Sequence, residues 1–145
     1  MQDDEEHFRK LERMYHGAPI NRYFEPRIQI ANGTAAIRMV VKPDFFHAAH
    51  AVHGSVYFKL LDDAAFFAVS SVVTDVFVLT ASYNIYLTRP VREGILHASG
   101  RVVHRSRSLF LAESELLDGD QRQVARGSGS FMRSTIALTP EVGYV

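Results

Sequence analysis

Two adjacent carboxylates interrupt the longest apolar run of the sequence. Asp62 and Asp63 lie in the middle of residues 53–73 (HGSVYFKLLDDAAFFAVSSVV), where most other side chains are aliphatic or aromatic. Burial disfavours the charged form of a carboxylate and raises its pKa, so a buried aspartate is more basic toward water than an exposed one. The pattern therefore favours a hydrolytic reaction in which one of these carboxylates activates water or attacks the substrate.

The two carboxylates differ in their neighbours. Lys59 precedes Asp63 by four residues, a spacing that places both on one face of a helix, so we interpret Asp63 as an ion-pair partner. Asp62 has no such partner nearby and is the stronger catalytic candidate. Two alternatives stay open: that Asp63 is the catalytic acid, and that Asp62 only makes a structural hydrogen bond across a dimer.

The start of the same run supplies a second reactive feature. Gly54 lets a ligand approach the backbone, Ser55 is a plausible N-cap, and the free amides of a first helical turn form an electropositive end. Eight residues of helix separate Gly54 from Asp62, which corresponds to about 12 Å of rise. One helix cannot direct both groups at one substrate atom, so a site that uses both needs two copies of the chain.

Three histidines precede this helix at intervals of three residues: His47, His50 and His53. A zinc site would need a further ligand and an open coordination position, and only Asp44 is nearby. We therefore expect no metal and no other cofactor, with one histidine orienting the site and the others lining its mouth.

Periodicity predicts the elements that position these residues. Spacings of three and four predict an N-terminal helix within residues 1–17 and a central helix over residues 53–73, apolar on nearly every side and hence enclosed. Asn32-Gly33 is a strong hairpin signal, and an alternation of period two dominates after Thr74. The expected fold is α+β, a curved antiparallel sheet of five to six strands wrapped around the central helix. The expected strands are 27–30, 34–42, 77–87, 94–104, 108–117 and 124–132.

Composition narrows the classes of function. The 145 residues predict a single domain, and 16 basic against 16 acidic side chains give zero net charge, so we expect no binding to nucleic acid or to a membrane surface. The absence of cysteine excludes disulfides and thiolate chemistry. The acidic N-terminus differs from a signal peptide, and charged residues interrupt the central helix, so the expectation is a cytoplasmic protein.

The order and spacing of several short motifs within residues 43–133 resemble the hotdog-fold acyl-CoA thioesterases of the PaaI-like (phenylacetate-pathway) group. The central helix begins after a Val-His-Gly sequence and carries an aspartate eight residues later, and a strand with a defined polar pattern follows. The matching residues are Val52-His53-Gly54, Asp62, Thr80, Asn84-Ile85, Pro90, Gly94, Leu96, Ala98 and Val103-His104-Arg105-Ser106-Arg107.

The resemblance implies a hotdog fold, a homodimer or homotetramer, and hydrolysis of an acyl-CoA at a dimer-interface site. By analogy, the Gly54 amide polarises the thioester carbonyl and Asp62 of the partner subunit is base or nucleophile. Thr80 places the attacking water, and His53 positions the loop or bonds the carbonyl.

At two positions the sequence departs from the family pattern, with His47 in place of an asparagine and Ser55 in place of a second glycine. If His47 holds the nucleophilic water by accepting a hydrogen bond from it, only the neutral imidazole can serve, and hydrolysis should fall as the ring protonates.

The expected function is therefore an acyl-CoA thioesterase; the alternative is a non-catalytic acyl-CoA-binding or sensing protein. The D-x-N-x-x-H arrangement of hotdog dehydratases is absent from the sequence. Ser55 is a candidate substrate contact, and three arginines at strand ends or turns either hold the CoA phosphates or are simply solvated: Arg89, Arg105 and Arg107. The aromatic residues near the site suit an aromatic or medium-chain acyl group.

Overall fold

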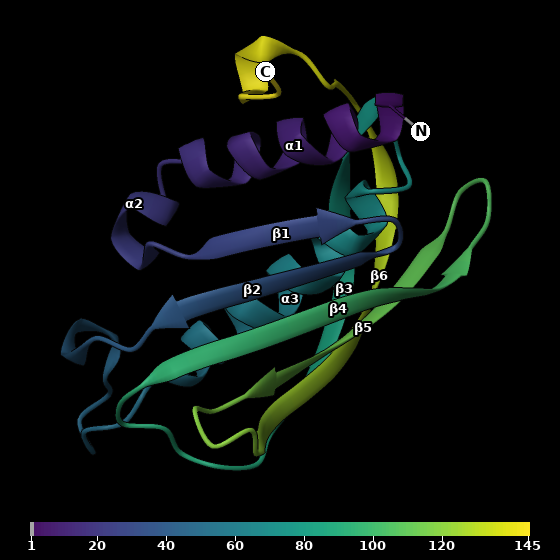
Figure 1. Cartoon of the computed structure of the whole chain (residues 1–145). Coiled ribbons are helices and arrows are strands. Elements are labelled where there is room, and N and C mark those ends of the chain that lie inside the picture. The colour runs from purple at the N-terminus through teal and green to yellow at the C-terminus, as the bar shows by residue number, and fades with distance from the viewer. Residues whose placement is uncertain (1) are drawn as a thin grey trace.

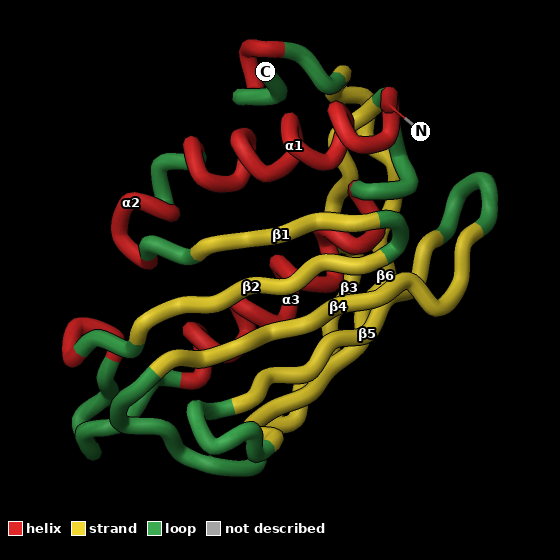
Figure 2. The backbone as a smooth tube through the Cα atoms, viewed as in Figure 1, coloured by secondary structure: helices red, strands yellow, loops and turns green. Residues whose placement is uncertain are grey.

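A single long helix packs against one face of a six-stranded antiparallel sheet in the computed structural model, which describes residues 2–145 (Figures 1 and 2). The strand order across the sheet is β1-β2-β4-β5-β6-β3. This arrangement confirms the predicted α+β layout. The strands are β1 (Arg27–Ala31), β2 (Thr34–Val40), β3 (Val76–Leu87), β4 (Ile95–Arg105), β5 (Phe110–Leu117) and β6 (Gln123–Ala137).

The helix on the sheet is α3 (Gly54–Ser70), and α1 (Gln2–Gly17) lies along the margin of the sheet beside β1 (Figure 1). A short helix, α2 (Asn21–Phe24), joins α1 to the sheet. Two single-turn 3-10 helices, Pro43–Phe45 and Pro140–Val142, lie before α3 and near the C-terminus.

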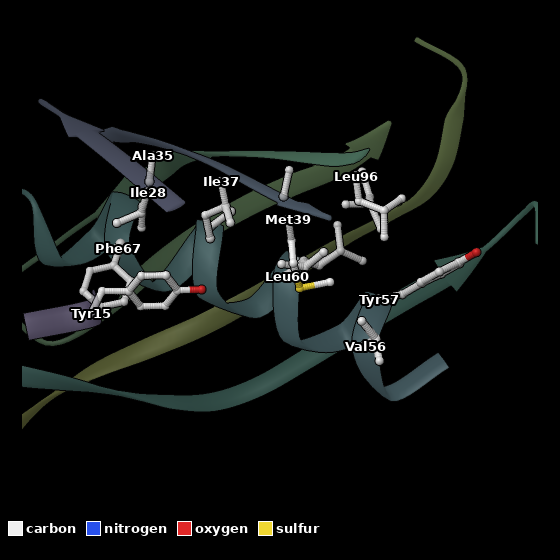
Figure 3. Packing of buried hydrophobic residues seen from close by; sticks show 14 of the residues in the cluster. Tyr15, Ile28, Ala35, Ile37, Met39, Val56, Tyr57, Leu60, Phe67 and Leu96 are labelled. Carbon is white, nitrogen blue, oxygen red and sulfur yellow. The ribbon is translucent and has the colours of Figure 1, made fainter. Parts of the chain in front are cut away.

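The core lies between α3 and the sheet because alternate strand residues face the helix. In β2, Ala35, Ile37 and Met39 are buried while their neighbours are exposed, the pattern that period two predicts. Figure 3 shows Ile37 and Met39 pointing toward the side of α3 that carries Leu60. Residues 60, 61, 64 and 65 of α3 are completely buried, so this side of the helix is held in one position by packing.

The β1 edge of the sheet is covered by side chains of α1. The Ile30 amide donates to the Glu12 carboxylate at 2.8 Å, and Arg9 donates to the Ile30 carbonyl at 2.9 Å. The Ile28 amide donates to Nε2 of His16 at 3.2 Å. These contacts satisfy backbone groups that an edge strand would otherwise leave open to another chain. Among the described strands, β3 forms the opposite margin of the sheet and pairs only with β6.

Several predicted boundaries were wrong by a few residues. The central helix spans Gly54–Ser70, shorter than the predicted 53–73, because His53 is its cap and the chain turns at Ser71. β5 begins at Phe110, since Ser106 and Leu109 hydrogen-bond each other in the preceding turn. β2 ends at Val40, and β6 continues past residue 132 to Ala137, where it pairs with the start of β3. The N-terminal helix agrees with the prediction over Gln2–Gly17, and residue 1 lies outside the described residues.

Candidate active site

Asp62 lies on the side of α3 that faces β3, within hydrogen-bonding reach of Thr80. The Thr80 hydroxyl donates to Oδ1 of Asp62 at 2.9 Å. Within residues 2–145 no donor reaches the other carboxylate oxygen, Oδ2, so this oxygen is available to a substrate or water. Burial raises the pKa of Asp62 to about 6, although the Thr80 hydrogen bond opposes the shift. The predicted rise in basicity is confirmed, and Asp62 is largely ionised at neutral pH.

A β-bulge orients Thr80 toward the helix. The pairing of β3 with β6 shifts between Thr80 and Ser82, which inserts Ala81 as an extra residue. In a regular strand residues 80 and 83 would face opposite sides of the sheet, whereas here both Thr80 and Tyr83 contact α3. The bulge therefore allows one strand to bind α3 at two successive points.

Asp63 is engaged in structural contacts, as its sequence context predicted. Lys59 Nζ lies 2.8 Å from Oδ2 of Asp63, and the Tyr15 hydroxyl donates to the same oxygen at 2.8 Å. The lysine also lies over the ring of Phe24, at 5.1 Å from its centroid. Asp63 thus ties α3 to α1 and α2, whereas Asp62 keeps an open oxygen.

A pocket of about 720 Å³ adjoins Asp62 and Thr80. Its walls come from α3, the end of α1 with the following turn, β3, β6 and the C-terminal 3-10 helix. The rings of Phe66 and Phe77 lie 5.4 Å apart, and those of Tyr15 and Phe67 lie 5.0 Å apart. The pocket therefore joins one reactive carboxylate to an aromatic wall, an arrangement that suits an apolar substrate arm.

The C-terminal wall of this pocket is fixed by a buried histidine of α1. Nδ1 of His7 lies 2.6 Å from the Tyr144 hydroxyl, and Nε2 lies 2.9 Å from the Ser70 carbonyl. A carbonyl can only accept, so Nε2 carries the proton toward Ser70. His7 thereby joins the C-terminal segment to the end of α3. Sequence reasoning did not find this wall, because His7 and Tyr144 are 137 residues apart and no local pattern relates them.

The N-terminal end of α3 presents the second predicted group. The N-cap is His53, whose Nδ1 accepts from the Ser55 amide at 3.0 Å, so the predicted capping role of Ser55 is wrong. An imidazole can cap in this way because its unprotonated nitrogen reaches the amide two residues ahead. Within the described chain no group accepts from the Gly54 amide, which leaves it as a free donor at the positive end of the helix.

His47 lies beside His53, with the ring centroids 6.4 Å apart. The Ala49 amide donates to Nδ1 of His47 at 3.0 Å, so the proton of the neutral ring lies on Nε2. The expectation that neutral His47 accepts a hydrogen bond from water is therefore wrong: its acceptor nitrogen is occupied, and the ring can only donate. The same reasoning places the proton of neutral His53 on Nε2.

The structure does not bring the Gly54 amide and the Asp62 carboxylate together within one chain. Gly54, Ser55, His47 and His53 form one cluster, which we call the amide end, and no contact links it to Asp62. Among residues 2–145, no group of three or more potential ligands for a metal ion occurs.

Of the three candidate arginines, only Arg89 is near the amide end. Its carbonyl accepts from the hydroxyl of Tyr57, which lies in the first turn of α3. Arg105 and Arg107 lie at the turn between β4 and β5, far from the loop before α3 (Figure 1). These two side chains cannot reach the amide end of their own chain.

Residues 49–125 match the family model described as the thioesterase superfamily. No curated protein sequence matches the chain significantly. No helix in the described part of the chain has the length and apolar character to cross a membrane.

Solved structures show the same fold at low sequence identity. The PaaI protein of the E. coli phenylacetic acid degradation operon superposes with a TM-score of 0.85 at 21% identity, covering 94% of this chain and 99% of that chain. A conserved protein of Pseudomonas aeruginosa gives 0.76 at 24% identity over 81% and 94% of the two chains. A mutant PaaI of Thermus thermophilus gives 0.73 at 21% over 81% and 100%. These similarities confirm the hotdog fold.

Proposed function

The chain belongs to the thioesterase superfamily, and from that premise we propose that it hydrolyses an acyl-CoA thioester to a free acid and CoA. The observation that carries the proposal is the environment of Asp62: a carboxylate with a pKa of about 6, one oxygen held by Thr80, the other open, beside an apolar pocket. A general base titrating near this value is matched to hydrolysis at neutral pH.

The reacting groups come from two copies of the chain in this proposal. Gly54 and Asp62 are separated by about 12 Å of helix rise, too far for both to act on one carbonyl carbon. The margin of the sheet at β1 is occupied by α1, whereas β3 presents its unpaired backbone beside Thr80. A homodimer formed along β3 would bring the amide end of one subunit toward Asp62 of the partner subunit.

Asp62, Gly54 and His53 carry the proposed chemistry. Asp62 removes a proton from water through Oδ2 while the water oxygen attacks the thioester carbonyl carbon. The Gly54 amide donates to the carbonyl oxygen as negative charge develops there, assisted by the Nε2 proton of His53. The carbon–sulfur bond then breaks, and the CoA thiolate leaves and takes up a proton. If Asp62 attacks the carbonyl directly, the same donors stabilise the same oxyanion and water hydrolyses the resulting anhydride.

The two arms of the substrate have distinct sites. The acyl group occupies the pocket beside Asp62, whose volume and aromatic wall suit an aromatic or medium-chain acyl group. Arg89 is assigned to the CoA phosphates because it lies next to the first turn of α3. Arg105 and Arg107 are assigned to CoA bound by the partner subunit, since they cannot reach the amide end of their own chain. Ser55 contributes its hydroxyl at the amide end.

The test is hydrolysis of a panel of acyl-CoAs, followed by colorimetric detection of free thiol. Asp62→Asn should keep the fold and abolish thiol release, while the matched control Asp63→Asn should lower thermal stability and retain activity, because it disrupts only the contacts to Lys59 and Tyr15. Equal losses in both variants would contradict the assignment of Asp62. Binding of acyl-CoA without thiol release by the wild type would favour a binding or sensing function.

A further inference from the structure

Tyr83 links β3 to the turn of α3 that carries Asp62. Its hydroxyl lies 3.2 Å from the Leu61 carbonyl and makes a short contact with the Ser114 hydroxyl, which donates to the same carbonyl at 2.8 Å. Each hydroxyl has one proton, so one of the two hydroxyls donates to the other, and the second donates to the Leu61 carbonyl. Leu61 directly precedes Asp62. The chain of hydroxyls therefore fixes the backbone to which the candidate catalytic carboxylate is attached.

The sheet leaves space for this tyrosine by omitting side chains. A Cβ at Gly127 would lie 2.5 Å from Cε1 of Tyr83, and a Cβ at Gly129 would overlap the other side of the same ring. Both glycines are in the interior of β6, where a glycine weakens a strand. A side chain at Gly127 or Gly129 would overlap both the Tyr83 ring and a β3 backbone carbonyl, that of Asn84 or Ser82 respectively, so the two glycines are explained by the close approach of the ring and of the β3 backbone together.

A second contact fixes the same turn of α3 from β4, the strand that pairs with β5. A Cβ on Gly100 of β4 would overlap the backbone of Ala64, so sheet and helix touch backbone to backbone at this point. Leu61 and Ala64 are one turn apart and flank Asp62. The inner side of this turn is thus held by β4, β5 and β3, while its outer side presents Asp62 to Thr80.

We propose that Tyr83 is a positioning residue, which acts together with Ser114 on the Leu61 carbonyl to hold Asp62 at the distance where Thr80 can donate to it. The β3 bulge allows this, because Thr80 contacts the carboxylate and Tyr83 contacts the backbone beside it. The proposal rests on the proposed function insofar as Asp62 is the reacting group. Tyr83 is itself a donor and not a base, because burial raises its pKa to about 12.

The test is Tyr83→Phe, which removes one oxygen and leaves the Ser114 hydroxyl bonded to Leu61. The matched control is Tyr23→Phe, an exposed tyrosine of α2, outside β3, whose hydroxyl also donates to a backbone carbonyl, that of Asp44. Four quantities are measured: kcat and KM for the best acyl-CoA, the pKa of Asp62 from the ¹³C shift of its carboxyl carbon, and Tm. Ser114→Ala serves as a second variant, because it breaks the same chain at the next hydroxyl.

We expect Tyr83→Phe to lower kcat by roughly 10- to 100-fold with KM unchanged, since small displacements of a catalytic group have effects of this size. The pKa of Asp62 should rise, because the Thr80 hydrogen bond that lowers it is weakened. In the double variant Tyr83→Phe/Thr80→Ala, kcat and the Asp62 pKa should equal those of Thr80→Ala alone, because both substitutions weaken the same hydrogen bond.

The two possible failures are distinguishable. A lower Tm with wild-type kcat and an unchanged Asp62 pKa, in both Tyr83→Phe and Ser114→Ala, would overturn the positioning role and leave the proposed function intact. If the wild type hydrolyses no acyl-CoA, a raised Asp62 pKa in Tyr83→Phe still supports the positioning role and rejects the reaction. An inactive wild type with an unchanged pKa would reject both.

Discussion

Gly54→Pro offers a direct test of the proposed oxyanion donor, because it removes one N–H and little else. Gly54 is the first residue of α3, the helical position where proline is best tolerated. His53 precedes it with φ −64° and ψ 144°, an extended conformation that is compatible with a following proline. We therefore expect α3 to form normally in this variant, with the Gly54 donor absent.

The expected magnitude follows from what this amide would do. Loss of one oxyanion donor costs about 2.7–4 kcal/mol in the transition state, a decrease in kcat of roughly 10²- to 10³-fold. KM should change little, since the charge on the carbonyl oxygen develops only in the transition state. Replacement of glycine also restricts the unfolded chain, which is worth about 0.4–1 kcal/mol, so Tm should not decrease.

Gly54→Ala is the matched control for added bulk. A Cβ at this position lies 3.0 Å from Cδ1 of Leu87 in both variants, and the half-exposed Leu87 side chain can move away. Alanine keeps the N–H, so the ratio of the two kcat values measures the donor. Both variants are assayed by thiol release, with circular dichroism and light scattering to verify fold and assembly. A proline variant within about threefold of the alanine variant would refute the assignment of Gly54.

Three further predictions concern the carboxylate and the histidine. The kcat/KM of the wild type should rise with pH through about 6 as Asp62 ionises. Thr80→Ala should move this acidic limb to higher pH, because the Thr80 hydrogen bond lowers the pKa of Asp62. A limb at the same pH in both proteins would contradict the assignment of the limb to Asp62. Burial raises the Asp62 pKa from 3.8 to about 6, so its contribution to stability is present below about pH 4 and lost as pH rises through 6. Asp62→Asn should therefore raise the free energy of unfolding at pH 7.5 by about 1–2 kcal/mol, allowing for partial exposure, with no gain at pH 4, as measured by denaturant titration. His47→Asn should retain activity and the acidic limb, because the amide NH₂ can replace the Nε2 donor; loss of the limb in this variant would contradict its assignment to Asp62.

Much of the fold could be predicted because its signals are local. The alternation in β2, the Asn-Gly turn before it and the apolar character of α3 each depend on neighbouring residues. The raised pKa of Asp62 and the Lys59–Asp63 pair could also be predicted from local sequence. The apolar run around Asp62 predicts its burial, and the spacing of four residues predicts the ion pair. Segment ends were less accurate, since they depend on turn hydrogen bonds such as that between Ser106 and Leu109.

The walls of the site could not be predicted, because they depend on contacts between distant segments. Tyr15 reaches Asp63 across 48 residues, and the C-terminal wall depends on His7. The state of His47 was also inaccessible to sequence reasoning. Whether this ring accepts or donates is decided by the Ala49 amide, and that contact exists only in the folded loop.

Three features that weaken local structure converge on one turn of α3. A carboxylate lies in a mostly buried helix, β3 contains a bulge, and β6 contains two interior glycines; each lowers stability in isolation. Selection for folding alone would favour an aliphatic residue at position 62 and a regular ladder between β3 and β6. Yet the glycines admit Tyr83, Tyr83 and Ser114 fix the Leu61 carbonyl, and the bulge turns Thr80 toward Asp62. Departures from folding rules that share one geometric result are expected at functional sites, and here that result is a single carboxylate with one oxygen held and one oxygen free.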